Sequence, residues 1–295
     1  MIRSLSRLFL HAIGKPPAPI GFEARDATFR DAANDPWFWS HYRDAAGIVL
    51  SLVPASCFAK DNTVVDFGCG DGATSLGIAS RVAARVVGVD LHTSYSSLPD
   101  MARRNLRMER LPANLAFEQV APGAPLPFRD GAVDLVYSWS VFEHLADVDG
   151  TLAEMSRIVR SGGRMFIQIE PLYHGPFGSH LQRLVREPWA HLLHDEEEFL
   201  RMAASAHDRV AENEKDVLYR THAFEDVKRH LLKEYRSLNR ITGDRLLARV
   251  SSAGFRIEES RLIQVENLRP DPRLLEKYPL ETLLTNQVVL TAIRE

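Results

Sequence analysis

The sequence predicts an α/β fold built around a doubly wound, mostly parallel β-sheet. Two observations support this prediction. Between residues 63 and 170, short apolar runs alternate with helical segments of about 10–15 residues, as in consecutive βαβ units. The same alternation returns after residue 240, and the segment in between is helical and polar. We therefore expect one sheet with a helical insertion after its fifth strand, at residues 171–240.

The predicted sheet has seven strands, which are short runs of β-branched and other apolar residues. In chain order they are Thr63–Phe67, Arg85–Asp90, Leu115–Val120, Val133–Ser138, Arg164–Glu170, Arg256–Ile263 and Asn286–Ile293. Helices are predicted between several of these strands, where apolar residues recur with the helical period. They are Thr74–Ala84, Pro99–Arg110, Asp147–Arg160 and Asp244–Ala253.

The chain divides into three predicted parts. Residues 1–46 form an N-terminal helical arm or lid, residues 47–170 and 241–295 form the core, and residues 171–240 form a helical cap that we expect to bind the substrate. Within residues 1–15, apolar side chains recur at helical spacing with Arg3 and Arg7 between them. This pattern predicts an amphipathic helix that packs on the protein's own body, with weak contact to a membrane surface as the alternative.

Composition excludes several classes of protein. The 36 Lys and Arg against 39 Asp and Glu give a net charge of −3, so the chain has no overall attraction to nucleic acid. Two cysteines in 295 residues exclude a disulfide framework and a Cys-rich zinc site, and they suit a reducing cytoplasm. The uncharged stretch Ala45–Ala59 is too short for a membrane span, which needs about 20 apolar residues. We therefore expect a cytoplasmic protein.

The most informative segment is the glycine-rich run Val64–Thr74. A buried strand is predicted to end at Gly68, Gly70 and Gly72, and a helix begins directly afterwards. Glycines at this point let the backbone turn tightly and approach a ligand closely. Asp90 follows Gly70 by twenty residues, at the end of the second predicted strand. In a Rossmann-like fold this position directs a carboxylate at the hydroxyls of a ribose, so the pattern indicates a ligand that contains adenosine.

The glycine pattern alone leaves the identity of that ligand open. Gly68-x-Gly70-x-x-Ala73 also fits the loose dinucleotide fingerprint, so NAD is an alternative. Asp66 and Asp71 argue against it, because their negative charge would repel a pyrophosphate and attract a positively charged ligand. The chain also lacks the Tyr-x-x-x-Lys pair that a short-chain dehydrogenase needs.

Further segments extend this pattern along the chain. They are VVDFGCGDGATS at residues 64–75, LPFRDGAVDLVY at 126–137, VFEHLAD at 141–147, SGGRMFI at 161–167 and AGF at 253–255. Taken together, the sequence resembles the class I S-adenosylmethionine-dependent methyltransferases, in particular the ubiquinone/menaquinone-methylase-like, or type 11, group. The resemblance covers about residues 60–170 and 241–263, and it implies a seven-stranded Rossmann-like sheet.

The resemblance also implies S-adenosylmethionine as cofactor and S-adenosylhomocysteine as product. We expect that no metal is required. By the family motif, Asp90 would bind the ribose and Leu91 would lie beside the adenine. Asp66 and Ser138 would lie near the methionine amino group. The residues that would surround the methionine end are Gly68, Cys69, Gly70 and Gly72.

The chain departs from the family pattern at one position. Members of the group usually carry an acid just after the third strand, which reaches the adenine amino group. This sequence has Pro122 at that place. Backbone groups or another side chain would then have to hold the adenine.

Two histidines are candidates for catalysis. If the methyl acceptor is a hydroxyl, a base helps to remove its proton, and histidine suits this role near neutral pH. His144 follows the fourth predicted strand, and His174 follows the fifth. For His144, capping of the following helix is the alternative role.

The substrate candidates are His180 and His194 in the insertion and Trp37 and Trp39 before the core. Seven of the eleven histidines lie within residues 171–230, which is more than chance predicts. The two tryptophans fit an aromatic lid, or alternatively a helix buried against the core. His191, His194 and Asp195 have a spacing that allows a shared metal ion on one helical face, but we expect packing or surface roles for them and no metal site.

These observations lead to one expected function. We expect a methyltransferase that acts on the hydroxyl of a small molecule, such as a sugar, a glycan precursor or a natural product. N- or C-methylation is an alternative, as is a protein that binds the cofactor without catalysis.

Overall fold

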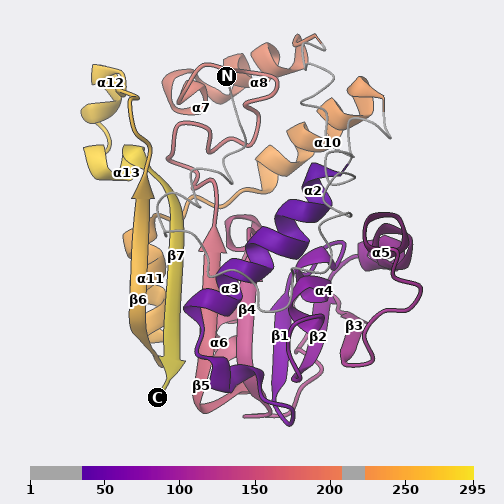
Figure 1. Cartoon of the computed structure of the whole chain (residues 1–295). Coiled ribbons are helices and arrows are strands. Elements are labelled where there is room, and N and C mark those ends of the chain that lie inside the picture. The colour runs from indigo at the N-terminus through magenta and orange to yellow at the C-terminus, as the bar shows by residue number, and fades with distance from the viewer. Residues whose placement is uncertain (1–34, 208–222) are drawn as a thin grey trace. The chain divides into compact units, whose positions relative to one another are not determined.

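A computed structural model describes residues 35–207 and 223–295 of the chain (Figure 1). The predicted amphipathic helix at residues 1–15, with its membrane alternative, lies outside this part, as does most of the predicted arm at residues 1–46. Residues 208–222 of the predicted cap also lie outside it. Among the described helices, none is long and apolar enough to cross a membrane.

The strands of the described chain form one seven-stranded sheet, as the sequence predicts. The strands are β1 (Thr63–Phe67), β2 (Arg85–Asp90), β3 (Leu115–Gln119), β4 (Val133–Trp139), β5 (Val159–Ile169), β6 (Phe255–Gln264) and β7 (Thr285–Arg294). Their order is β3-β2-β1-β4-β5-β7-β6, and the pairs β1–β2, β1–β4 and β2–β3 are parallel. Strand β7 runs in the opposite direction to β6 (Figure 1).

The four helices that the sequence predicts between strands are present as α4, α5, α6 and α11, and the structure adds others. Before and between the first four strands they are α2 (Pro36–Trp39), η2 (Ser40–Ala45), α3 (Ala46–Leu52), η3 (Ala55–Phe58), α4 (Ala73–Ala79), η4 (Ser94–Ser97) and α5 (Leu98–Leu106). The later ones are η5 (Phe142–His144), α6 (Val148–Ile158), α7 (Ala190–Leu193), α8 (Glu196–Ala204), α10 (Phe224–Ser237), α11 (Gly243–Ser252), α12 (Pro272–Leu275) and α13 (Leu280–Leu284).

The chain forms two compact units. Among the described residues, the first unit comprises 35–139, Ala153–Phe166 and Thr291–Glu295, and the second comprises Ser140–Leu152, 167–207 and 223–290. Strands β1 to β4 belong to the first unit and β6 to the second.

In the first unit, an aromatic segment packs beside the glycine-rich run. Asp35 caps α2 by accepting a hydrogen bond from the Phe38 amide at 3.1 Å. The side chains of Phe38, Trp39 and Tyr42 are buried in a cluster that includes residues of α4 and α5. A Cβ at Gly77 of α4 would collide with the Tyr42 carbonyl oxygen, so glycine permits the close approach of α4 and η2. This packing places α2 next to the loop after β1.

In the second unit, the described part of the insertion has its own core. Its buried members are Tyr173, Leu181, Val185, Ala190, Phe199, Ala203 and Tyr235. The segment is less helical than the sequence predicts, because residues 171–189 form turns before α7 begins. Gly178 explains one such turn, since a Cβ there would collide with the carbonyl oxygen of Tyr173.

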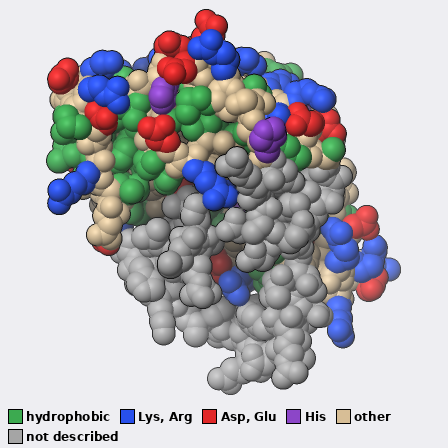
Figure 2. Space-filling model, turned by 90° about the horizontal axis from the view of Figure 1, so that it is seen from above, with side chains coloured by type: hydrophobic (Ala, Val, Ile, Leu, Met, Phe, Trp, Pro, Cys, Tyr) green, Lys and Arg blue, Asp and Glu red, His purple; other side chains and the backbone are tan. Residues whose placement is uncertain are grey.

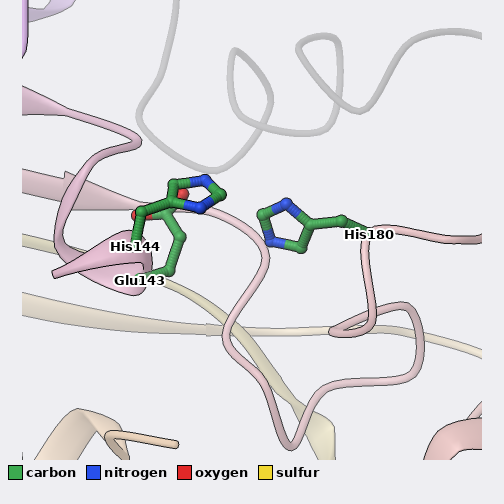
Figure 3. Close-up of side chains that lie close together, drawn as sticks. All are labelled: Glu143, His144 and His180. Carbon is green, nitrogen blue, oxygen red and sulfur yellow. The ribbon is translucent and has the colours of Figure 1, made fainter. Parts of the chain in front are cut away.

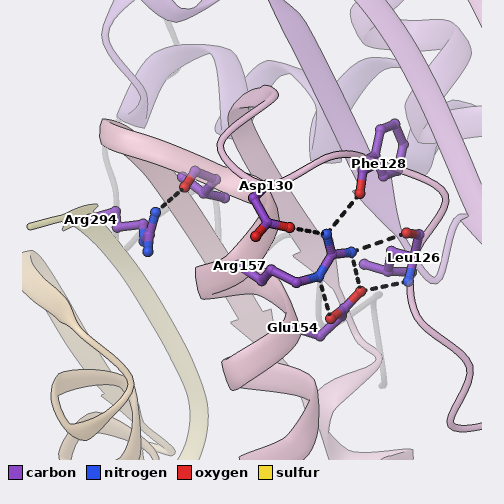
Figure 4. A network of polar contacts seen from close by, with 7 residues as sticks. Leu126, Phe128, Asp130, Glu154, Arg157 and Arg294 are labelled. Carbon is purple, nitrogen blue, oxygen red and sulfur yellow. Dashed lines mark hydrogen bonds and ion pairs between the residues drawn. The ribbon is translucent and has the colours of Figure 1, made fainter.

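A network of polar contacts in the first unit fixes the segment that leads into β4 (Figure 4). Arg157 of α6 donates to the carbonyl oxygens of Leu126 and Phe128 at 3.1 and 2.9 Å. It also contacts the carboxylates of Glu154 and Asp130 at 2.6 and 2.7 Å. Glu154 in turn accepts from the Leu126 amide at 2.6 Å. One guanidinium thus satisfies two loop carbonyls and holds a helix against this segment.

We expect Arg157→Ala to lower the free energy of unfolding by about 2 kcal/mol, because it removes several charge-assisted hydrogen bonds at once. Urea denaturation measures this change. Arg103→Ala is the matched control, since Arg103 forms an exposed pair with Asp100 at 2.8 Å that is also spaced i,i+3. Its loss should cost less than about 0.5 kcal/mol. Equal effects of the two substitutions would contradict the role of the network.

Candidate functional site

The loop between β1 and α4 has a backbone that requires glycine. Gly68, Gly70 and Gly72 have φ values of 77°, 53° and 79°, in the left-handed region that favours this residue. A Cβ at Gly72 would lie 2.6 Å from the Phe117 ring, so this glycine is also needed for packing. At Gly70 a Cβ would meet nothing within 4 Å among the residues that the structure describes. The loop is therefore tight on one side and open at Gly70.

Asp90 joins this loop to the end of β2. Its two carboxylate oxygens accept hydrogen bonds from the backbone amides of Gly70 and His92, both at 2.9 Å. The neighbouring Leu91 side chain is 46% exposed, which is rare for a large apolar residue in this structure. The Gln119 side chain donates to the Leu91 carbonyl oxygen at 3.0 Å. The end of β2 thus offers the carboxylate of Asp90 and the exposed side chain of Leu91. The carboxylate lies beside the open Gly70 of the loop.

Asp66 and Ser138 lie beneath the loop. The Asp66 carboxyl group is buried and accepts a hydrogen bond from Ser75 of α4 at 2.5 Å. Burial raises the pKa of Asp66 to about 7, and the hydrogen bond from Ser75 acts in the opposite direction. Ser138 of β4 is also buried and donates to the Phe67 carbonyl oxygen at 3.0 Å. Both side chains therefore brace the ends of the strands that carry the loop.

Cys69 is buried within the loop, and burial raises the pKa of its thiol. A protonated, buried thiol is a poor nucleophile and behaves as a small apolar side chain. The Cys69 side chain therefore packs inside a tight turn, as expected for a residue between two left-handed glycines.

The two tryptophan candidates have different surroundings. The Trp37 side chain is 45% exposed, and its indole Nε1 donates to Asp71 of the glycine loop at 2.7 Å. Trp39 is buried and packs edge-on against Phe38 and Tyr42, with ring centroids 5.7 and 5.9 Å apart. Trp37 is therefore available at the loop, whereas Trp39 contributes to the core.

In the second unit, Glu143, His144 and His180 come together (Figure 3). Each side chain offers an oxygen or nitrogen atom, and these atoms lie within 4.8 Å of one another. The two imidazole rings meet edge to face at 5.2 Å between centroids. Burial lowers the pKa of His144, and it lowers the pKa of His180 to about 4. Both rings are therefore neutral at pH 7.

His174 lines a cavity of about 230 Å³ in the same unit. The cavity is bounded by polar groups such as Thr242, Asp244 and Thr285 as well as by apolar side chains. The ring contacts Tyr278 at 5.3 Å, and its buried Nδ1 atom has no hydrogen-bond partner among the described residues. Burial lowers the pKa of His174, so the ring is in its neutral form near pH 7, which is the form that acts as a general base.

The remaining histidines of the insertion have other partners. His191 is buried and bonds to the Tyr173 carbonyl oxygen at 2.6 Å, while Asp195 caps α8 through the Glu198 amide. The His194 ring contacts the carboxylates of Glu187 and Glu198 at 3.3 and 3.1 Å. These pairings explain His191, His194 and Asp195 without a shared ion. On the face seen in Figure 2, basic, acidic and histidine side chains are interspersed.

Comparison with known proteins shows which family the region around the glycine loop resembles. Residues 65–167 match the family described as "Methyltransferase domain", Methyltransf_11. This region is a class I methyltransferase domain of the type 11 group. The chain is 36% identical over 110 residues to a chloroplastic tocopherol O-methyltransferase of Arabidopsis thaliana, covering 37% of this chain and 30% of that protein. It is 39% identical over 151 residues to a trans-aconitate 2-methyltransferase of Azoarcus, covering 50% and 52%.

These matches span a third to a half of the curated relatives. A solved structure of Haemonchus contortus phosphoethanolamine N-methyltransferase 2 with S-adenosyl-L-methionine covers 99% of this chain and 60% of that chain. It has a TM-score of 0.51 and 14% sequence identity, so it supports the fold of the methyltransferase domain and nothing finer.

Sequence reasoning missed Glu143 and Gln119. Glu143 lies directly before His144 in the segment that resembles the family, but nothing in the sequence indicates that its carboxyl group is buried against a histidine. Pro122 lies in an exposed turn, where the Ala124 amide bonds to the Ala121 carbonyl oxygen. Gln119, which pairs with Asp90 in the β2–β3 register, is the polar side chain held beside Leu91.

The buried Asp66 makes stability depend on pH. In the unfolded chain Asp66 loses its proton near pH 4, whereas in the folded protein its pKa is about 7. Stability is therefore lost as pH rises from about 4 to about 7, and the loss is complete above that range. Asp66→Asn keeps an acceptor for Ser75 and carries no charge. We expect it to be more stable than the wild type at pH 8, by on the order of 2 kcal/mol, and to differ little at pH 4. Thermal unfolding of both proteins across this range tests the expectation, and a constant difference would contradict it.

Proposed function

We propose that the methyltransferase domain binds S-adenosylmethionine and transfers its methyl group to the hydroxyl of a small molecule. A sugar, a glycan precursor and a natural product are the acceptor classes we favour. One observation carries the cofactor assignment: Asp90 is held at the tip of β2 against the open Gly70 of the loop. The tocopherol O-methyltransferase among the relatives supports transfer to oxygen.

The loop residues have the properties that this ligand requires. The Asp90 carboxylate would accept hydrogen bonds from the two ribose hydroxyls, and the exposed Leu91 would contact the adenine face. Gly68, Cys69, Gly70 and Gly72 would surround the methionine end, where the lack of side chains permits close approach. We assign Asp66 and Ser138 to the support of this loop, because both are buried and bonded to it or to its flanking elements.

When bound, the cofactor would supply an electrophilic methyl carbon next to a sulfonium. The chain's own task is then to hold the acceptor oxygen in line behind that carbon, to exclude water and to receive the hydroxyl proton. His174 and His144 are proposed for the last step, since both imidazoles are neutral and His174 has a nitrogen on a cavity without a partner in the described chain.

We propose residues 171–240 as the substrate region and residues 47–170 with 241–295 as the core that carries the cofactor site. His180 and Trp37 are the stronger substrate candidates. Trp37 is exposed beside the loop, and His180 has a ring nitrogen with no partner in the part that the structure describes. His194 and Trp39 are weaker ones, as they are engaged by carboxylates and by the core. The cytoplasmic location and the absence of nucleic-acid partners stay predictions from the sequence.

Asp90→Ala should weaken S-adenosylmethionine binding by about 10- to 100-fold, because it removes two charge-assisted hydrogen bonds to the ribose. Isothermal titration with S-adenosylmethionine, S-adenosylhomocysteine and NAD in parallel measures this loss. Asp100→Asn is the control, since it removes an equal charge from an exposed position on α5. Binding of NAD alone, or unchanged affinity in Asp90→Ala, would contradict the cofactor assignment.

His174→Ala should reduce turnover by about 10²- to 10⁴-fold and leave cofactor affinity unchanged, as expected for loss of a general base. In the wild type the rate should rise with pH and level off below pH 6.5, because burial lowers the pKa of His174 and the neutral ring is the active form. A screen of hydroxylated acceptors, sugars first, supplies the assay. A rate that ignores both the substitution and pH favours N- or C-methylation. Cofactor binding without turnover on any acceptor favours a non-catalytic binding protein.

A further inference from the structure

The cluster of Glu143, His144 and His180 in the second unit has the composition of a metal site. Glu143 and His144 belong to the short helix η5, and His180 comes from the turn segment before α7 (Figure 3). One oxygen or nitrogen atom from each side chain lies within 4.8 Å of the other two. Ligands on opposite sides of an octahedral ion with bonds of about 2.1 Å lie about 4.2 Å apart. Small side-chain rotations therefore bring all three atoms into range of one ion.

The potential ligand atoms of Glu143 and His180 are buried and lack partners within the described chain. Glu143 is 2% exposed, and neither of its carboxylate oxygens has a hydrogen-bond partner among residues 35–207 and 223–295. The same holds for the buried Nε2 atom of His180. Buried polar atoms in folded proteins are nearly always satisfied, and a bound ion can satisfy those that protein groups leave unpaired. The unpaired Nε2 atom of His180 and the unpaired oxygens of Glu143 lie close together, and this points to a shared occupant.

The surrounding chain holds these side chains in place. The Asn239 side chain donates to the carbonyl oxygens of Phe142 and Leu145 at 2.5 and 3.0 Å, on either side of Glu143 and His144. The Asn239 amide donates to the Glu143 carbonyl oxygen at 2.9 Å. His180 has a φ of 59°, a left-handed conformation that is strained for a residue with a side chain. Such preorganisation is typical of binding sites.

The surroundings of the cluster are acidic. The carboxyl groups of Glu170 and Glu234 lie near enough to Glu143 to interact with it electrostatically. Glu170 accepts hydrogen bonds from the uncharged side-chain amides of Asn286 and Gln287, at 3.3 and 3.1 Å. A divalent cation is the kind of ligand that suits a set of carboxyl groups and imidazole nitrogens.

From this geometry we propose that Glu143, His144 and His180 bind one divalent transition-metal ion. Two imidazole nitrogens and one carboxylate oxygen suit Zn²⁺, Fe²⁺, Co²⁺ or Mn²⁺ better than Mg²⁺ or Ca²⁺, which prefer oxygen ligands alone. Three protein ligands leave further coordination positions for water or a substrate oxygen. This proposal differs from the expectation, drawn from the sequence, that the protein needs no metal.

One consequence rests on the proposed function. A hydroxyl group bound to such an ion loses its proton at a lower pH than a free one. His144 would then be a ligand rather than the base, and the proton would pass to solvent or to His174. The ion-binding proposal itself does not depend on methyl transfer.

The test uses the full-length chain without a polyhistidine tag, stripped with a chelator and dialysed. Titration with Zn²⁺ by calorimetry should show one ion per chain. Addition of Co²⁺ should give the visible absorption bands of a site with nitrogen ligands. We expect Glu143→Gln and His180→Asn each to weaken Zn²⁺ binding at least 100-fold, because loss of a direct ligand exceeds the 10- to 100-fold effect of an outer-shell partner. Asparagine tolerates the left-handed backbone at position 180, and circular dichroism checks that both variants fold.

His194→Asn is the matched control, because His194 is a surface histidine beside two carboxylates and could itself collect Zn²⁺. The His194→Asn variant should still bind one Zn²⁺ ion with the affinity of the wild type. Zn²⁺ binding that is lost in His194→Asn and kept in the other two variants would overturn the proposal, as would the absence of stoichiometric binding. Calorimetry with S-adenosylmethionine on the same samples separates the two proposals, since Asp90→Ala should weaken cofactor binding and leave the Zn²⁺ site intact.

Discussion

The hydrogen bond between Asp90 and the Gly70 amide is the constraint on which the candidate cofactor site depends. It ties the loop after β1 to the end of β2, and the three glycines of that loop take left-handed conformations. Buried Asp66 and Ser138 brace the strand ends beneath this loop. The aromatic packing of α2 and η2 against α4 then brings Trp37 to the same loop. All of these contacts therefore help to fix the backbone of the loop between β1 and α4.

Local signals in the sequence were sufficient for the sheet and for this loop. The bounds of β1 and β2 match those predicted, because short β-branched runs between glycines and charged residues admit few other conformations. β5 begins at Val159 instead of Arg164, since Gly162 and Gly163 lie within the strand and not in a turn before it. Glycines are ambiguous in this respect, because they suit both a turn and a close approach inside a sheet.

The cluster of Glu143, His144 and His180 could not be predicted from local sequence signals. Glu143 and His180 lie far apart in the sequence, and their meeting depends on how residues 171–189 turn and on Asn239, which is farther still along the chain. The two tryptophans show the same limit at short range. Trp37 and Trp39 are two residues apart, yet one reaches the glycine loop and the other is buried, because the turn of the helix sends them to different faces.

The contrast between these two kinds of site has a physical basis. A cofactor that is common to a whole family is recognised by backbone conformation, and left-handed glycines and a strand-end carboxylate leave a clear pattern in the sequence. An acceptor or a metal ion is held by side chains that tertiary packing brings together from distant segments. In this chain the first kind of residue lies in the first unit, and Glu143, His144, His174 and His180 lie in the second.

The buried carboxylate of Glu143, which has no hydrogen-bond partner in the described chain, is difficult to explain as a packing residue. An apolar side chain of that size would fill the space without the cost of burying polar atoms that lack partners. Glu143 also lies beside the imidazoles of His144 and His180, within 4.8 Å between their potential ligand atoms. An occupant that needs all three side chains accounts for their meeting at one place.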